Sequence, residues 1–149
     1  MYKHILIAAD GSKTSTKAVR HGLKLAKSVE TSKVTIVTVT EMMSALAMSA
    51  GMDAGMALPF EDYERDAASA AEKILSAAKK LAEREGVPCQ TEHIPDQRPS
   101  EAIVAAARKK KCNLIVMGSH GRRGIDRLLL GSQASEVLTN STVPVLVVK

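Results

Sequence analysis

The sequence has very few aromatic residues. Phe, Trp and Tyr together make up 2% of its 149 residues, and Trp is absent. Apolar residues still reach 45%, so the core must be aliphatic, built from Ala, Val, Ile and Leu. Proteins that bind RNA or single-stranded DNA stack the bases on exposed aromatic faces. Because the sequence has almost no material for such faces, we expect no nucleic-acid partner.

Cysteine and long apolar runs are also scarce. The two cysteines, Cys89 and Cys112, have neither CxxC spacing nor partner histidines at metal-ligand spacing. We therefore expect two free thiols in a reducing compartment. No apolar stretch is long enough to span a bilayer, and the N-terminus passes into a strand-like run without a signal-type apolar region. These features predict a cytoplasmic protein with no membrane span.

The charge balance is basic. Lys and Arg number 21 against 16 Asp and Glu, which gives a formal net charge of +5. Such a balance suits nucleic acid, an anionic membrane surface or a phosphate-bearing small ligand. The densest run, from Arg108 to Lys111, ends a helical stretch that begins near Ser100. Cations there complement the helix dipole, and a binding patch is the alternative.

Five short segments rich in apolar or β-branched residues alternate with helical patterns. The predicted strands are 5–9, 34–39, 89–94, 114–117 and 143–148, and the helices follow Ser12 and cover about 60–85, 100–111 and 131–138. The alternation predicts one α/β domain over residues 1–149. It should form a doubly wound five-stranded parallel sheet of order 3-2-1-4-5, with helices on both faces.

Two helical details and one loop can also be predicted. Ser12 should cap the first helix, and the long helix should bury one apolar face. That face is expected to comprise Tyr63, Ala67, Ala70, Ile74, Ala78 and Leu81. Residues 42–59 hold five of the seven methionines among Ala, Gly and Ser. We expect a mobile loop there, with a methionine-rich lid or partner surface as the alternative.

A glycine-rich loop follows the fourth strand. Gly118, Gly121 and Gly131-Ser132 give the pattern G-x2-G-x9-G-S between a buried strand and a helix. Glycine permits positive φ and close approach of a ligand, and the amides at a helix start favour phosphate. The pattern is neither a P-loop nor G-x-G-x-x-G. These glycines on their own could equally be tight turns.

Asp10 ends the first strand, and the predicted strand order places it beside the glycine loop. Strands one and four flank the switch point of such a sheet, where ligands bind at the carboxyl ends. A carboxylate accepts hydrogen bonds from ribose hydroxyls or holds Mg²⁺. Asp10 could also be a turn residue that helps to start the first helix, and the two roles can hold together.

These segments resemble the universal stress protein family over the whole chain. The most specific part runs from Leu114-Ile115-Val116-Met117-Gly118 through Gly121 to Gly131-Ser132 and matches the ATP-binding branch, which carries G-x2-G-x9-G-[ST]. The resemblance implies an adenine nucleotide alpha hydrolase-like fold. It also implies a nucleotide-binding set of Ala8, Asp10, Val39, Met117, Gly118, Ser119, Gly121, Arg122, Gly131, Ser132 and Gln133. In that set Val39 would meet the adenine, and Asp10 the ribose or a Mg²⁺ ion.

We therefore expect a regulatory or stress-response protein that binds ATP or AMP. The alternatives are a slow ATPase or nucleotidyl-transfer enzyme, and a dimeric interaction module with a vestigial pocket. We assign no catalytic residue, because His120 is a lone loop histidine without a carboxylate partner. The apolar segment Val143 to Val148 should lie at the sheet edge, which, with the resemblance, predicts a homodimer through this strand. The downstream protein partner is unknown.

Overall fold

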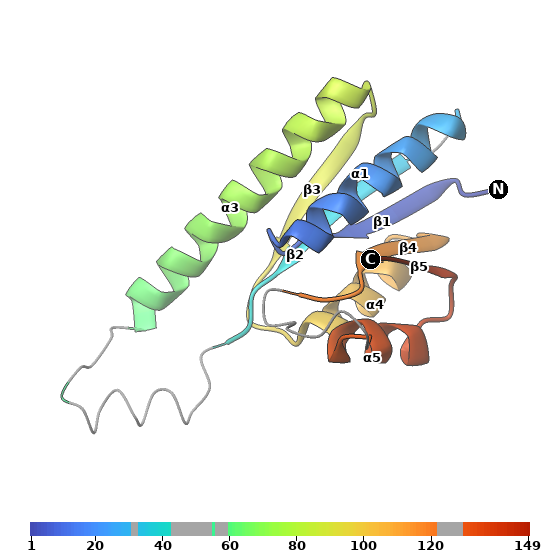
Figure 1. Cartoon of the computed structure of the whole chain (residues 1–149). Helices are drawn as coiled ribbons and strands as arrows, with labels where there is room; N and C mark the ends of the chain where they lie inside the picture. The colour runs from blue at the N-terminus through green and yellow to red at the C-terminus, as the bar shows by residue number, and fades with distance from the viewer. Residues whose placement is uncertain (31–32, 43–54, 56–59, 122–129) are drawn as a thin grey trace.

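A computed structural model describes residues 1–30, 33–42, 55, 60–121 and 130–149 (Figure 1). Most of the methionine-rich segment 42–59 and residues 122–129 of the glycine loop therefore lie outside the described residues. The elements are β1 (His4–Ala8), α1 (Lys13–Ser28), β2 (Lys33–Val39), α3 (Phe60–Glu85), β3 (Cys89–Ile94), α4 (Pro99–Lys109), β4 (Leu114–Gly118), α5 (Ser132–Asn140) and β5 (Val145–Val148).

The five strands form one parallel sheet of order β3-β2-β1-β4-β5. Helices α1 and α3 pack together on one face, and α4 and α5 pack together on the other (Figure 1). The predicted fold class and strand order are confirmed. Strand β5 begins two residues later than predicted. Pro144 has no N–H for the ladder, and only its carbonyl takes part, accepting from Ile115 N at 3.0 Å.

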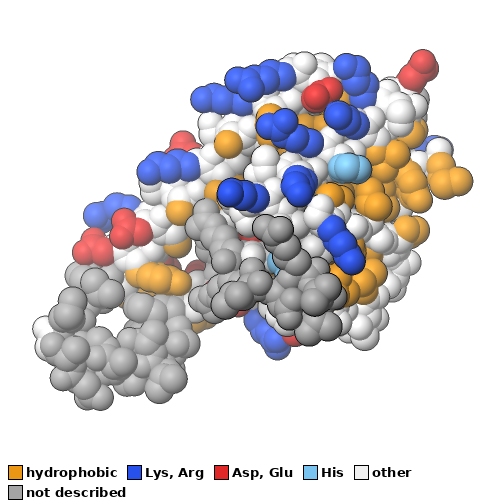
Figure 2. Space-filling view, viewed as in Figure 1, with side chains coloured by type: hydrophobic (Ala, Val, Ile, Leu, Met, Phe, Trp, Pro, Cys, Tyr) orange, Lys and Arg blue, Asp and Glu red, His pale blue; other side chains and the backbone are white. Residues whose placement is uncertain are grey.

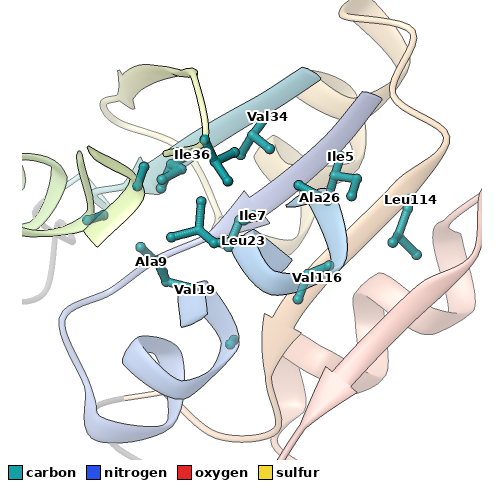
Figure 3. Packing of buried hydrophobic residues seen from close by; sticks show 14 of the residues in the cluster. Ile5, Ile7, Ala9, Val19, Leu23, Ala26, Val34, Ile36, Leu114 and Val116 are labelled. Atoms are coloured by element: carbon teal, nitrogen blue, oxygen red, sulfur yellow. The ribbon is translucent and has the colours of Figure 1, made fainter. Parts of the chain in front are cut away.

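Strand β1 is the centre of two aliphatic clusters. Ile5 and Ile7 point toward Leu23 of α1 on one face, and Leu6 points into the cluster beneath α4 and α5 (Figure 3). All three β1 side chains are fully buried. Burying one such side chain stabilises the fold by about 1.5–3 kcal/mol. The fully apolar strand that the sequence showed is thus explained by helices on both faces.

A tight turn joins β1 to α1. Gly11 has a φ of +80°, which a residue with a side chain rarely adopts. Ser12 then caps α1 as predicted, because its hydroxyl accepts from Ser15 N at 3.0 Å. The Asp10 carboxylate accepts from Ser12 N at 2.8 Å, and Asp10 N donates to Ser15 Oγ at 3.2 Å. These contacts fix Asp10 at the carboxyl end of β1.

The predicted buried face of α3 was right at Ala78 but one position too early at Ala70, Ile74 and Leu81. The buried residues are Ala71, Leu75, Ala78 and Ala82, whereas Ala70 is exposed. Alanines lie on several sides of this helix, so their spacing does not distinguish the core side from its neighbours. Ile74 and Leu81 are only half-buried, at the margin of the cluster beneath α1.

Two further observations concern the cysteines and the character of the helices. Cys89 and Cys112 are both free, and burial raises the pKa of the Cys112 thiol to about 11. A thiol of that kind stays protonated and unreactive at neutral pH. None of the described helices has the length and apolar character to cross a membrane.

Candidate functional site

The carboxyl ends of β1 and β4 meet at a pocket of about 430 Å³. A Cβ atom built on Gly121 would lie 3.0 Å from Asp10 Oδ2, so the Asp10 turn and the glycine loop are in contact. The pocket is lined by Ala8, Ala9, Asp10, Ser15, Val37, Val39, Glu41, Pro99, Ile103, Met117, Gly118, Ser119, His120, Gly121, Gly131, Ser132, Gln133 and Ala134. This is the switch point of the sheet, where open α/β folds bind ligands.

All the residues of the predicted nucleotide-binding set line this pocket except Arg122, which lies outside the described residues. Several lining residues were not predicted. Val37 and Ile103 join Val39 and Met117 in an apolar wall, since all four belong to one cluster beneath α4 and α5. The approach of α4 to this wall depends on how the helix packs, so no local pattern in the sequence could have indicated Ile103.

The glycines at this site are required for space rather than for an unusual backbone conformation. Glycine permits positive φ, but Gly118, Gly121 and Gly131 all lie outside the positive region. A Cβ on Gly118 would lie 3.1 Å from Ser15 N, and one on Gly131 would lie 2.8 Å from the carbonyl oxygen of Ser119. The loop therefore packs directly against the start of α1 and against its own backbone.

The first turn of α5 supplies backbone N–H donors for an anion, but the N–H of Gly131 is not among them. The N–H of Gly131 donates to Ser119 O at 2.8 Å and is therefore occupied. Ser135 N donates to Gly131 O, which begins the helical ladder. Helix geometry leaves the amides of Ser132, Gln133 and Ala134 without intrahelical acceptors. These three amides, at the positive end of the helix dipole, are the donors that α5 can offer to an anion.

The Gln133 side chain has a structural partner. Its Oε1 accepts from Ser100 N at 2.9 Å, at the start of α4, where the N-cap residue Arg98 makes no side-chain capping bond. The Ser100 hydroxyl donates to Glu136 of α5, and Arg98 lies 3.3 Å from the same carboxylate. This network fixes α4 against α5 at the rim of the pocket. The Gln133 side-chain carbonyl is thus engaged with the fold.

Ser119 and His120 form a pair at the end of β4. Ser119 is 1% exposed, and its N–H donates to Val148 O at 2.8 Å. Its hydroxyl lies 2.8 Å from His120 Nδ1, while His120 Nε2 is buried without a hydrogen-bond partner. The sequence had indicated no partner for this histidine. In the structure its partner is the hydroxyl of the preceding serine, whereas the sequence interpretation had considered only a carboxylate partner.

The charged residues that line the described part of the pocket are Asp10 and Glu41, together with the titratable His120. Among the described residues there is no group of three His, Cys, Asp or Glu side chains that could hold a metal ion. A lone carboxylate fits Mg²⁺ when phosphate oxygens and water complete its shell. Asp10 is suited to this role, since its Oδ2 faces the glycine loop.

Comparison with known proteins gives a consistent result. The model of the universal stress protein family matches residues 1–149. The universal stress protein MJ0531 of Methanocaldococcus jannaschii is 37% identical over 149 residues, which cover 100% of this chain and 83% of that protein.

Two solved structures extend this similarity. The MJ0577 structure is 28% identical with a TM-score of 0.81, over 100% of this chain and 96% of that one. MJ0577 is a universal stress protein of the same organism. A universal stress protein in complex with cAMP is 28% identical with a TM-score of 0.71, over 99% and 97% of the two chains. The family model spans the whole chain, and the fold matches that of the MJ0577 structure: this protein belongs to the universal stress protein family.

Proposed function

We propose that the switch-point pocket binds an adenine nucleotide, ATP or AMP, and that the protein acts as a nucleotide-responsive regulatory or stress-response factor. One observation carries the proposal: a single pocket combines an apolar wall, the free amides of α5 and a carboxylate. A relative that is 28% identical over nearly its whole length was solved with cAMP, an adenine nucleotide.

The lining suggests an orientation for the ligand. The adenine packs between Val39 and Met117, because these side chains form the apolar wall. Asp10 Oδ2 accepts hydrogen bonds from the ribose hydroxyls. The phosphates then lie near Gly121 and the first turn of α5, where Ser132 offers both an amide and a hydroxyl.

Binding of Mg²⁺ at this site would not by itself imply hydrolysis of the nucleotide. When bound, Mg²⁺ would neutralise phosphate charge, and Asp10 is the residue that would hold it. Fast phosphoryl transfer needs a positioned nucleophile and charge stabilisation at the γ-phosphate. No Lys or Arg lines the described part of the pocket to stabilise charge at the γ-phosphate, so we expect binding without fast turnover. Steady phosphate release that disappears in Asp10→Ala would support slow ATP hydrolysis instead.

The nucleotide proposal is tested by isothermal titration and thermal unfolding with ATP and AMP. Saturating nucleotide at about 100 times Kd should stabilise the fold by about 2.7 kcal/mol. Asp10→Asn is the informative variant, because its Oδ1 still accepts from Ser12 N while an NH₂ group replaces the second acceptor. Losing a hydrogen bond to a charged group should weaken binding by roughly 10- to 100-fold.

The matched control is Asp96→Asn. Asp96 is exposed in the turn after β3, with a φ of +57° that Asn tolerates well. The affinity of the Asp96→Asn variant for ATP and AMP should equal that of the wild type. Wild-type protein that shows neither heat of binding nor stabilisation with either nucleotide would overturn the proposal.

We also propose that two copies form a homodimer by pairing at the segment Val143 to Val148. Strand β5 is the last strand of the sheet, and Val145, Leu146 and Val147 are only half-buried. An apolar strand with one unpaired edge is a ready template for another strand. Isologous pairing about a twofold axis would cover both edges at once.

A further inference from the structure

Helix α1 carries a row of cations and no acidic residue. Its Lys and Arg residues recur at steps of four, three, four and three, and all are exposed. They are Lys13, Lys17, Arg20, Lys24 and Lys27. This spacing keeps them on one side of the helix, opposite the buried Ala18, Gly22 and Ala26. At 1.5 Å per residue the row is about 21 Å long.

The neighbouring helix extends this surface. Helix α3 packs beside α1, and its exposed Lys73, Lys80 and Arg84 recur at steps of seven and four, opposite the buried stripe of α3. We call the α1 row and these three residues the cationic face, and Figure 2 shows Lys and Arg side chains spread over this side of the molecule. Glu85 lies 3.9 Å from Lys27, and Asp66 lies two turns before Lys73 on the same side of α3.

The cationic face carries no large exposed apolar side chain. The large exposed hydrophobic residues in the described chain are Met1, Met42, Phe60, Leu130 and Leu138, none of which lies on α1 or among the cations of α3. Protein interfaces need a buried apolar or aromatic centre, and helices that bind membranes insert apolar side chains. A surface whose long exposed side chains are mainly Lys and Arg is suited to a partner that presents mainly fixed negative charges.

We propose that the cationic face binds the phosphate backbone of double-stranded nucleic acid, without reading its sequence. The earlier expectation of no nucleic-acid partner was based on the lack of aromatic residues. That lack disfavours single strands, but phosphate contacts do not need aromatic residues. This proposal does not depend on nucleotide binding in the pocket.

Salt dependence is the quantitative signature of such binding. If the five α1 cations each contact one phosphate, the logarithm of the affinity should fall with the logarithm of the salt concentration, with a slope of about −4 to −5. Raising the salt from about 50 to about 200 mM would then weaken binding by about 500-fold. Affinity should not differ between unrelated duplexes of equal length, because no base is contacted.

The experiment measures fluorescence anisotropy of labelled duplexes of about 24 base pairs against the full chain over this salt range. The test variant is Lys17→Gln with Lys24→Gln, in the middle of the α1 row. It should reduce the magnitude of the slope by about 2 and weaken binding at low salt by roughly tenfold or more. The matched control is Lys109→Gln with Lys111→Gln, which removes two exposed charges from the end of α4. The control should leave the slope unchanged.

Three outcomes would overturn the proposal. It fails if the duplex does not bind at low salt, or if both double variants weaken binding equally. It also fails if anionic phosphatidylserine vesicles bind this face and the duplex does not. Thermal unfolding of each variant verifies folding, and these exposed side chains should change stability by less than about 0.5 kcal/mol.

Discussion

At the residue scale, Asp10 has a role in both the fold and the site. Its Oδ1 accepts from Ser12 N and helps to start α1, while its Oδ2 faces Gly121 across the pocket. The sequence was compatible with a ligand role, a turn role or both. The structure shows the turn role directly, and none of the hydrogen bonds among the described residues uses the second oxygen. A short turn can supply both because a carboxylate has two acceptor atoms.

The far end of the sheet contains a histidine whose titration should affect stability. His4 Nδ1 lies 3.1 Å from Lys110 O, and Nε2 lies 2.9 Å from the hydroxyl of the fully buried Thr35. Burial lowers the pKa of His4, against the hydrogen bond to Lys110 O, and the charges of Lys33 and Lys110 lower it further. Lys110 is itself paired with Glu92 at 2.7 Å.

The sign of the pH effect follows from the lowered pKa. Below about pH 6.5 the unfolded chain binds a proton at His4, whereas the folded chain binds it only at lower pH. The free energy of unfolding should therefore fall as the pH drops from about 7.5 to about 5.5. In His4→Gln that fall should be smaller, measured by urea unfolding at both pH values. The exposed His21→Gln is the control, and an equal fall in His4→Gln and wild type would refute the assignment.

At the element scale, the start of α5 depends on close packing. A Cβ on Gly131 would lie 2.8 Å from Ser119 O, which is a backbone atom. Ser119 cannot easily move, because its N–H donates to Val148 O in β5. Gly131→Ala should therefore destabilise the fold by about 1–3 kcal/mol, which is typical of overpacking. The midpoint of urea unfolding measures this loss.

Gly121→Ala is the matched comparison. Among the described residues its Cβ would meet Asp10 Oδ2 alone, at 3.0 Å, and this side-chain oxygen needs to shift by only a few tenths of an ångström. We expect a smaller loss of stability than for Gly131→Ala, because one contact involves the backbone and the other a side chain. Equal losses in the two variants would show that space at the start of α5 is not the reason for Gly131.

The elements also show what local pattern can and cannot determine. The type and order of the strands and helices could be predicted because apolar strands alternate with amphipathic helices and Gly86 ends α3 with a φ of +69°. The buried side of α3 could not, because small Ala residues lie on several of its sides. The occupied Gly131 amide was also unpredictable, since its acceptor, Ser119 O, is defined by tertiary packing.

At the scale of the whole molecule, the fold separates three surfaces. The switch-point pocket opens at the carboxyl ends of the strands, the cationic face lies on α1 and α3, and the outer edge of β5 ends the sheet. The pocket was predictable from fold topology, because a doubly wound sheet has one switch point. The cationic face required the structure, since only packing showed that the cations of α1 and α3 share one side.

The proposed homodimer concerns the whole molecule, and the β5 ladder allows a selective test. Pro144 O and Val148 O accept from β4, so the backbone of Leu146 also faces inward and that of Val147 faces the open edge. Val147→Pro removes an outward N–H, which a single subunit tolerates at an edge strand. Sedimentation equilibrium should give twice the chain mass for the wild type and the single mass for Val147→Pro. Leu146→Pro should unfold at lower temperature because it breaks the ladder to β4, and a monomeric wild type at micromolar concentration would rule out the dimer.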